Sequence, residues 1–403
     1  MRRRPARRRL PPLLATVAVA AACGDRPAAP AAAIRDSAGV RIVEYASWAP
    51  PVVAWRVAAT PLLAIGALEG DEAYQFDRLQ SVTRLTDGRI VVANGGTQEL
   101  RLFAPDGRHL SSLGRKGGGP GEFEGLSLVR VVAGDTLVTY DWNLRRLSVF
   151  APDRGFVRSV AIEFAGGLPN VLGVFGSGTV LATRGFVFGP GEMSGVVRDT
   201  APFLRFGPDG RLLDSIGRWP SWEYYVQGDR SSVWASSLPF GRTTLSAVTR
   251  TGFWVGATDR YEIERRDSTG VLAMIVRATR PARAVTPEDV ERVKADRLED
   301  ADENWRRRQE RMFREMPIPS TLPAFAALQT DPDGNLWVLD TFTPSDSVRR
   351  WAVFAPDGLL RGTVETPPSV RVLEIGRDYV LGTWEDELGV QYVRMYRLER
   401  ERG

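Results

Sequence analysis

Short runs of alternating apolar and polar residues, separated by turn residues, recur along most of the chain. The runs are rich in β-branched and aromatic residues, which is typical of β-strands. Six of them come shortly after a glycine in a turn-like segment: Gly88, Gly134, Gly178, Gly252, Gly334 and Gly376. The pattern predicts an all-β chain assembled from hairpins, with each glycine marking the turn before a second strand.

One turn sequence is repeated four times. It reads Phe-Ala-Pro-Asp-Gly at 103–107 and 354–358, Phe-Ala-Pro-Asp-Arg at 150–154, and Phe-Gly-Pro-Asp-Gly at 206–210. Proline presets the first dihedral angle of a turn, aspartate can bond to the backbone, and glycine permits a positive φ. Each copy therefore predicts a tight connection between antiparallel strands.

The spacing of the hairpins predicts a circular repeat. Glycine intervals of 46, 44 and 42 residues fit four-stranded units, and intervals of 74 and 82 residues contain insertions. Four-stranded units of about 45 residues are typical of β-propeller blades. We therefore expect a six-bladed β-propeller over residues 39–403.

The two ends of this domain are expected to close the ring. The last unit ends after one strand that follows Thr383, and it lacks an outer strand. The segment 61–66 has the sequence Pro-Leu-Leu-Ala-Ile-Gly, which resembles the outer strand of the first unit at 109–114. A strand from the N-terminal side would thus complete the last blade and cover an open edge.

The first 22 residues are expected to form a signal peptide. Six arginines precede an apolar stretch from Leu10 to Ala22, which is too short to cross a membrane, since a spanning helix needs about 20 residues. Cys23 follows directly and is the only cysteine in the chain. This arrangement resembles the lipobox of bacterial lipoproteins and implies a lipid on Cys23. The alternatives are an ordinary signal peptide with a chance cysteine, and export by the twin-arginine route.

Composition defines the segment after the cysteine and the charge of the exported chain. Residues 23–38 are rich in alanine and proline and are expected to be a tether.

Six of the 53 basic residues lie in the signal peptide, which leaves 47 against 49 acidic residues. This balance predicts no nucleic-acid partner, because binding to phosphates needs a clustered basic surface.

The sequence from Leu113 to Phe123, Leu-Gly-Arg-Lys-Gly-Gly-Gly-Pro-Gly-Glu-Phe, resembles NHL-type and related six-bladed propeller lipoproteins of bacteria. The resemblance covers residues 40–399 and implies the propeller fold. It implies little about activity, because the family consists mostly of scaffolds, with lyases and lactonases among its relatives. Gly24 after the lipidated cysteine resembles the pattern of lipoproteins sorted to the outer membrane, with the protein facing the periplasm or the cell surface.

Three long insertions are expected on one face of the propeller, at 185–200, 218–239 and 281–323. The last contains a predicted helix or helix pair within 284–320, beginning with Thr286 as N-cap and Pro287. Residues 287–316 include 18 charged side chains, and Leu298, Trp305 and Met312 form an apolar stripe. This stripe would pack on the rim of the propeller or dock a partner.

The ends of the second strands are expected to surround the mouth of the central channel. All six residues at these ends are polar: Asn94, Asp141, Arg184, Thr258, Asp340 and Thr383. They could bind a polar ligand, hold calcium, or only stabilise turns. Because calcium sites gather oxygen ligands and Arg184 lies in the ring, we expect no metal and no other cofactor.

The predicted function is a lipid-anchored binding or scaffolding module that meets a protein, peptide or glycan through its elaborated face. Trp219, Trp222, Tyr224 and Tyr225 in the second insertion could stack on such a partner or pack within the loop. No catalytic residue is named. The alternative is an enzyme of the lactonase or lyase type with chemistry around Asp141 and Asp340.

Overall fold

The computed structural model describes residues 32–48, 55–164, 166–185, 194–228, 233–298 and 302–400. Cys23, the expected signal peptide and most of the expected tether lie outside these residues. The described chain is almost entirely β-structure, with two α-helices, α1 (Pro287–Leu298) and α2 (Glu303–Glu315), and two short 3-10 helices at Glu72–Tyr74 and Ala133–Asp135.

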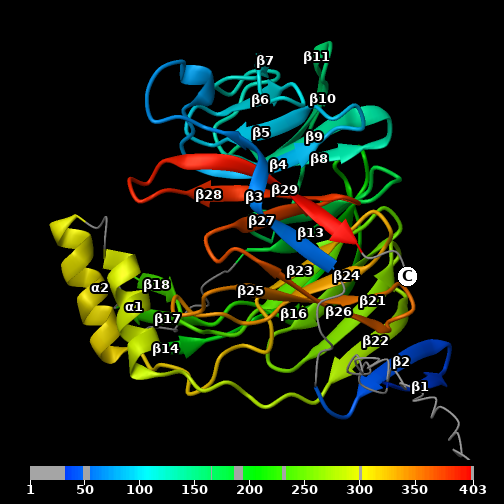
Figure 1. Ribbon diagram of the computed structural model, residues 1–403, viewed down its shortest axis with the longest axis vertical. Coiled ribbons are helices and arrows are strands. Elements are labelled where there is room, and N and C mark those ends of the chain that lie inside the picture. The colour runs from blue at the N-terminus through cyan, green and yellow to red at the C-terminus, as the bar shows by residue number, and fades with distance from the viewer. Residues whose placement is uncertain are drawn as a thin grey trace, which may run out of the picture.

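The strands form six blades (Figure 1). Each blade contains four antiparallel strands, which are named below from the innermost strand outward. The first blade contains β4 (Leu79–Arg84), β5 (Ile90–Asn94), β6 (Glu99–Phe103) and β7 (His109–Leu113). The second contains β8 (Leu126–Val132), β9 (Thr136–Asp141), β10 (Arg146–Ala151) and β11 (Gly155–Ala161). The third contains β12 (Pro169–Val174), β13 (Val180–Arg184), β15 (Thr200–Phe206) and β16 (Leu212–Pro220).

The remaining three blades follow the same order. The fourth contains β19 (Thr244–Val248), β20 (Gly252–Ala257), β21 (Glu262–Asp267) and β22 (Leu272–Ala278). The fifth contains β23 (Ala327–Thr330), β24 (Leu336–Leu339), β25 (Arg349–Phe354) and β26 (Leu360–Thr366). The sixth contains β27 (Arg371–Ile375), β28 (Tyr379–Glu385), β29 (Gln391–Arg400) and β3 (Trp55–Ile65).

The blades form a closed ring around a central channel. Each innermost strand contacts the innermost strand of the next blade, from β4 through β8, β12, β19, β23 and β27 back to β4. Large apolar side chains fill the spaces between blades; Tyr261, Phe325 and Phe354, for example, pack between the fourth and fifth. The β-propeller expected from the repeat is therefore present.

The repeated turn sequence forms hairpin turns, as predicted. The N–H of Gly107 donates to the carbonyl of Ala104 at 2.9 Å, and the Asp106 side chain accepts the N–H of Arg108 at 3.0 Å. Gly107 has a φ of 88°, a conformation that suits glycine because it has no Cβ. Aspartate and glycine in this sequence therefore stabilise the turn between strands.

An N-terminal strand completes the last blade, as predicted. β3 pairs antiparallel with β29, with Ile65 opposite Val393 and Trp55 opposite Arg400. The strand is longer than the segment 61–66 that the sequence indicated, because its apolar residues continue back to Trp55, which packs against Trp337. The pairing joins the two ends of the domain.

A second N-terminal hairpin, β1 (Ala32–Ser37) and β2 (Val40–Tyr45), extends the fourth blade, which the sequence did not predict. β2 runs parallel to β22. Residues 32–37 therefore form a strand in the segment that was expected to be tether. The side chains of this strand are mostly exposed, and it is held by pairing with β2. β2 is anchored by burial: Val43 and Tyr45 are at most 1% exposed, and the Tyr45 hydroxyl accepts the N–H of Leu360 at 2.6 Å.

Segments of all three insertions fold together beside the ring. β14 (Ser194–Val197), β17 (Tyr224–Gly228) and β18 (Val233–Ser237) form a separate sheet, and α1 and α2 lie next to it (Figure 1). Buried Tyr225 and Leu238 pack with Met312 and Met316. We call these three strands and two helices the accessory module.

The helix pair confirms the predicted helical insertion, but the apolar stripe is not continuous. α1 ends at Leu298, and α2 begins after the N-cap Asp302, whose side chain accepts the N–H of Trp305 at 2.9 Å. Trp305 is 44% exposed, whereas Met312 is buried in the accessory module. The stripe is interrupted because Leu298 lies in α1 and the other two residues in α2, and because Trp305, near the start of α2, lies outside the buried cluster that contains Met312.

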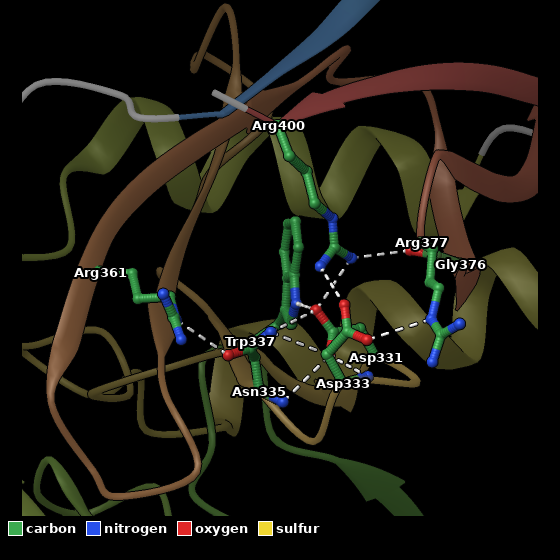
Figure 2. A network of polar contacts seen from close by, with 8 residues as sticks. All are labelled: Asp331, Asp333, Asn335, Trp337, Arg361, Gly376, Arg377 and Arg400. Carbon is green, nitrogen blue, oxygen red and sulfur yellow. Dashed lines mark hydrogen bonds and ion pairs between the residues drawn. The ribbon is translucent and has the colours of Figure 1, made fainter. Parts of the chain in front are cut away.

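A polar clasp holds the last two blades together on the side of the turns between first and second strands (Figure 2). The Asp331 side chain is fully buried and accepts the indole N–H of Trp337 at 3.1 Å and the guanidinium of Arg400 at 3.0 Å. Arg400 also binds Asp333 at 2.8 Å and lies 4.4 Å from the ring of Trp55. The clasp therefore joins the end of β29 and the start of β3 to the fifth blade.

We expect Asp331→Ala to lower the free energy of unfolding by about 3 kcal/mol, because it leaves Arg400 and Trp337 without their buried acceptor. Chemical denaturation measures the change. Asp357→Ala is the matched control, since Asp357 lies in an exposed turn and accepts one N–H from Leu359 at 3.0 Å. A similar loss in both variants would contradict the role of the clasp.

We expect Met312→Ala to loosen the accessory module without opening the ring, because Met312 belongs to a separate buried cluster. Truncating a buried methionine costs about 2–5 kcal/mol. Hydrogen exchange should show lost protection in α1 and α2 and unchanged protection in the blades. Arg311→Ala, at an exposed position of α2, is the control. Equal loss of protection throughout the blades would show that the module is not a separate unit.

Candidate functional site

Three of the six residues predicted at the channel mouth are buried and bonded to the backbone. The side-chain amide oxygen of Asn94 accepts the backbone N–H of Asp77 at 3.0 Å. Asp141 accepts the N–H groups of Glu124, Gly125 and Leu144 at 2.7, 3.0 and 2.9 Å. The Thr258 hydroxyl accepts the N–H of Thr243 at 3.0 Å. In each case the side chain stabilises the segment that enters its blade.

The other three residues lie in different surroundings. Arg184 forms an ion pair with Asp199 at 2.6 Å and lines a cavity of about 210 Å³. Asp340 forms an ion pair with Arg280 at 2.7 Å and lines a larger cavity. Thr383 is half-buried in β28, opposite Arg371 and Val393. The structure therefore places Arg184 and Asp340 at two separate cavities.

The larger cavity has a volume of about 620 Å³ and lies between the fourth and fifth blades. Its walls come from the loop between β20 and β21, the segments flanking the helices, and the loop between β24 and β25. We call it the Arg-rich pocket, because its charged lining residues are Arg242, Arg260, Arg280, Arg283, Arg350, Asp259, Asp340 and Asp346. Its lining thus has five arginines against three aspartates, and two of these arginines, Arg260 and Arg350, form ion pairs with Glu262 at 2.7 Å and Glu365 at 2.8 Å.

Tyr261, at this pocket, has a hydroxyl group without a hydrogen-bond partner among the described residues. Its side chain lines the pocket and is 3% exposed. Burial raises the pKa of Tyr261 well above its usual value, the nearby Asp340 carboxylate adds to the shift, and the Arg280 guanidinium opposes it. The hydroxyl therefore stays protonated near neutral pH. A buried polar group without a partner is costly, and such groups in native structures indicate a missing ligand or water.

Arg280 is fixed next to this tyrosine. Besides its ion pair with Asp340, its guanidinium lies 4.7 Å from the ring of Trp48 and 5.0 Å from the ring of Tyr261. Stacking on aromatic rings holds the guanidinium in one orientation. The wall formed by these side chains is therefore preorganised.

Arg242 joins the pocket to the base of the accessory module. Its guanidinium donates to the carbonyl of Thr321 at 3.0 Å and to the Thr321 hydroxyl at 2.8 Å, and its backbone N–H donates to Glu223 at 2.7 Å. Within the described chain, no carboxylate lies within 4.0 Å of this guanidinium. Arg242 thus adds positive charge without an ion pair of its own, and it helps to lower the pKa of the nearby Asp259.

Two of the three carboxylates of the pocket, Asp259 and Asp346, form ion pairs with arginines of the protein and have lowered pKa values. The ion pair with Arg198 at 2.7 Å lowers the pKa of Asp259. For Asp346, burial raises the pKa, but hydrogen bonds from Arg283 and Thr343 outweigh it, and the net shift is downward. Both groups remain ionised near neutral pH, so neither is a natural general acid.

The aromatic residues predicted to stack on a partner are divided between packing and exposure. Trp219 is buried against Phe203, with ring centroids 4.5 Å apart, and Tyr225 is buried in the accessory module. Trp222 is 51% exposed, and with Tyr224 it lines the cavity of about 210 Å³. The structure therefore supports packing for Trp219 and Tyr225.

Sequence reasoning named Asp340 but not Tyr261, Arg242 or Arg280. Tyr261 follows a turn in a charged segment, Thr-Asp-Arg-Tyr-Glu, and nothing in that pattern distinguishes it from a strand residue. The one available signal was the pair Arg280 and Arg283 at the start of the third insertion.

Two further observations concern metals and membranes. No group of three or more His, Cys, Asp or Glu side chains within the described ranges is arranged to hold a metal ion. No helix in that part of the chain is long and apolar enough to span a membrane.

Comparison with known proteins shows likeness in structure but not in sequence. No protein-family model matches the chain, and no curated protein matches it. A DUF4221-family protein from Bacteroides vulgatus shares 10% identity over 86% of this chain and 99% of its own, with a TM-score of 0.53.

Two other solved structures are less similar in shape. A candidate exported protein from Bacteroides fragilis shares 11% identity over 90% of this chain and 100% of its own, with a TM-score of 0.48. Virginiamycin B lyase from Staphylococcus aureus shares 8% identity over 86% of this chain and 99% of its own, with a TM-score of 0.41. The chain therefore shares its fold with the DUF4221 protein, and at 10% identity the likeness is one of fold alone.

Proposed function

We propose that this protein is a lipid-anchored, extracytoplasmic β-propeller of the NHL-like kind that binds a small acidic ligand in the Arg-rich pocket. The observation that carries the proposal is the buried Tyr261 hydroxyl, which has no partner among the described residues and lies in a wall with excess arginine. An acidic ligand would offset the charge of the arginines and could accept this hydrogen bond once the side chains that cover the hydroxyl move aside.

The size of the pocket supports a ligand and not only ordered water. Small-molecule sites have volumes of about 300–1,000 Å³, and the Arg-rich pocket measures about 620 Å³. This volume suits an acidic sugar, an acidic dipeptide or the charged end of a longer peptide or glycan. These ligands belong to the partner classes that the sequence indicated.

The alternative enzyme, with chemistry shared between Asp141 and Asp340, has less support. Asp141 accepts three backbone N–H groups, whereas Asp340 is paired with Arg280 in the pocket. A lactonase or lyase site of the expected kind would need these carboxylates, or others with raised pKa values, to converge on one ligand. Binding without turnover is the simpler use of the pocket.

We expect Tyr261→Phe to weaken binding of the ligand about two- to tenfold, the loss for one hydrogen bond, without lowering stability, because no protein partner is lost. Titration calorimetry would compare glucuronic acid with glucose, and an acidic dipeptide with its amide. Tyr140→Phe is the matched control: its hydroxyl donates to Pro169 at 2.6 Å, so stability should fall and affinity should not. Failure of every acid to bind, or equal binding of the uncharged compounds, would contradict the proposal.

The proposed anchor is tested separately. We expect Cys23→Ser to move the protein from the membrane fraction to the soluble fraction, because the lipidated sulfur is removed and the described chain has no helix able to span a membrane. Immunoblots of fractionated cells give the distribution. Ala22→Ser, beside the cysteine, controls for general effects on export. An unchanged membrane fraction in the cysteine variant would refute lipidation.

A further inference from the structure

The central channel contains a second candidate site, separate from the Arg-rich pocket. The innermost strands of all six blades enclose a cavity of about 200 Å³. Its lining includes four uncharged polar residues, Thr83, Ser246, Gln329 and Thr330, and the charged residues Arg130 and Glu374. A charged side chain in a narrow channel is costly unless neighbouring groups compensate it. The neighbours of Glu374 and of Arg130 therefore decide whether either one could bind a ligand.

Glu374 already has hydrogen-bond donors among its own neighbours. Its carboxylate accepts the Thr83 hydroxyl at 2.6 Å, the N–H of Arg84 at 3.3 Å and the hydroxyl of Tyr379. The carboxylate oxygens therefore already have several donors. Glu374 is held against the wall formed by β4 and β27.

Arg130, in contrast, is only partly satisfied. One terminal nitrogen donates to the Ser81 hydroxyl at 3.2 Å and to the Val129 carbonyl at 3.0 Å. Its other terminal nitrogen and Nε have no partner among the described residues, and no described carboxylate lies within 4.0 Å of the guanidinium. The side chain is accessible from the channel. It therefore presents unused donors and a positive charge to the enclosed space.

The residues around the channel add further donors. β8, which carries Arg130, and β23, which carries Gln329, are opposite each other in the cycle of six inner strands. The side chains of Ser246 and Gln329 line the cavity and form no hydrogen bond with the rest of the described chain. A ligand bound to Arg130 would thus have an amide and a hydroxyl within the same cavity.

We propose that the channel binds a small oxyanion, either a carboxylate or phosphate, on the free donors of Arg130. The free guanidinium edge matches two oxygens of such an anion. The volume excludes larger ligands. Burial lowers the pKa of Arg130, and a bound anion would oppose that shift.

Calorimetric titration of the soluble propeller with sodium acetate and with sodium phosphate, at fixed ionic strength, tests the proposal. We expect saturable binding that weakens at least about tenfold in Arg130→Gln, the loss for a charge-assisted hydrogen bond. Glu374→Gln should tighten binding, because it removes the negative charge facing the guanidinium. Arg211→Gln, at an outer position where the side chain is 86% exposed, is the matched control and should bind as the unmodified protein does.

The outcomes separate the possible sources of the anion and the two sites. Acetate binding without phosphate binding would assign the channel to carboxylates, and the reverse would assign it to phosphate. Tyr261→Phe should leave this binding unchanged, since Tyr261 lines the other cavity. Absence of saturable binding by either anion, or equal binding in Arg130→Gln, would overturn the proposal.

Discussion

Pairing of β3 with β29 is the interaction on which the rest of the structure depends. A propeller whose first and last blades were not joined would leave an unpaired strand at each end and could open between blades. Here the ends of the domain share one sheet, and the buried Asp331 binds Arg400 at the end of that sheet. The innermost strands of all six blades enclose the channel, and the Arg-rich pocket lies between two neighbouring blades, so both require a ring that stays closed.

Arginine provides most of the positive charge and has two distinct uses. At the surface and in the clasp it forms ion pairs, as Arg400 does with Asp331 and Asp333. At the two candidate sites, Arg242 and Arg130 lie within cavities and have no carboxylate within 4.0 Å in the described chain. Each guanidinium lines a cavity without an ion-pair partner of its own, which makes these two arginines the strongest indicators of anionic ligands.

The insertions add structure to the propeller and leave its six blades in place. Regular blades need only short connections, and the long connections of the third, fourth and fifth blades build the accessory module and one side of the Arg-rich pocket. Function in rigid β-scaffolds commonly resides in such connections. The link between Arg242 and Thr321 connects the end of the second insertion to the third at the edge of the pocket, so the position of the module and the shape of the pocket depend on each other.

The sequence by itself determined the hairpins, the propeller and the closing strand, because strand alternation and Pro-Asp-Gly turns are local properties that repeat along the chain. It also placed Asn94, Asp141 and Asp340 at the ends of second strands. Only the tertiary structure decided which of these reach a cavity. Asn94 and Asp141 bond to nearby backbone N–H groups, whereas Asp340 meets Arg280 and Tyr261 from another blade. Contacts between blades depend on the three-dimensional packing of distant segments, which no local pattern encodes.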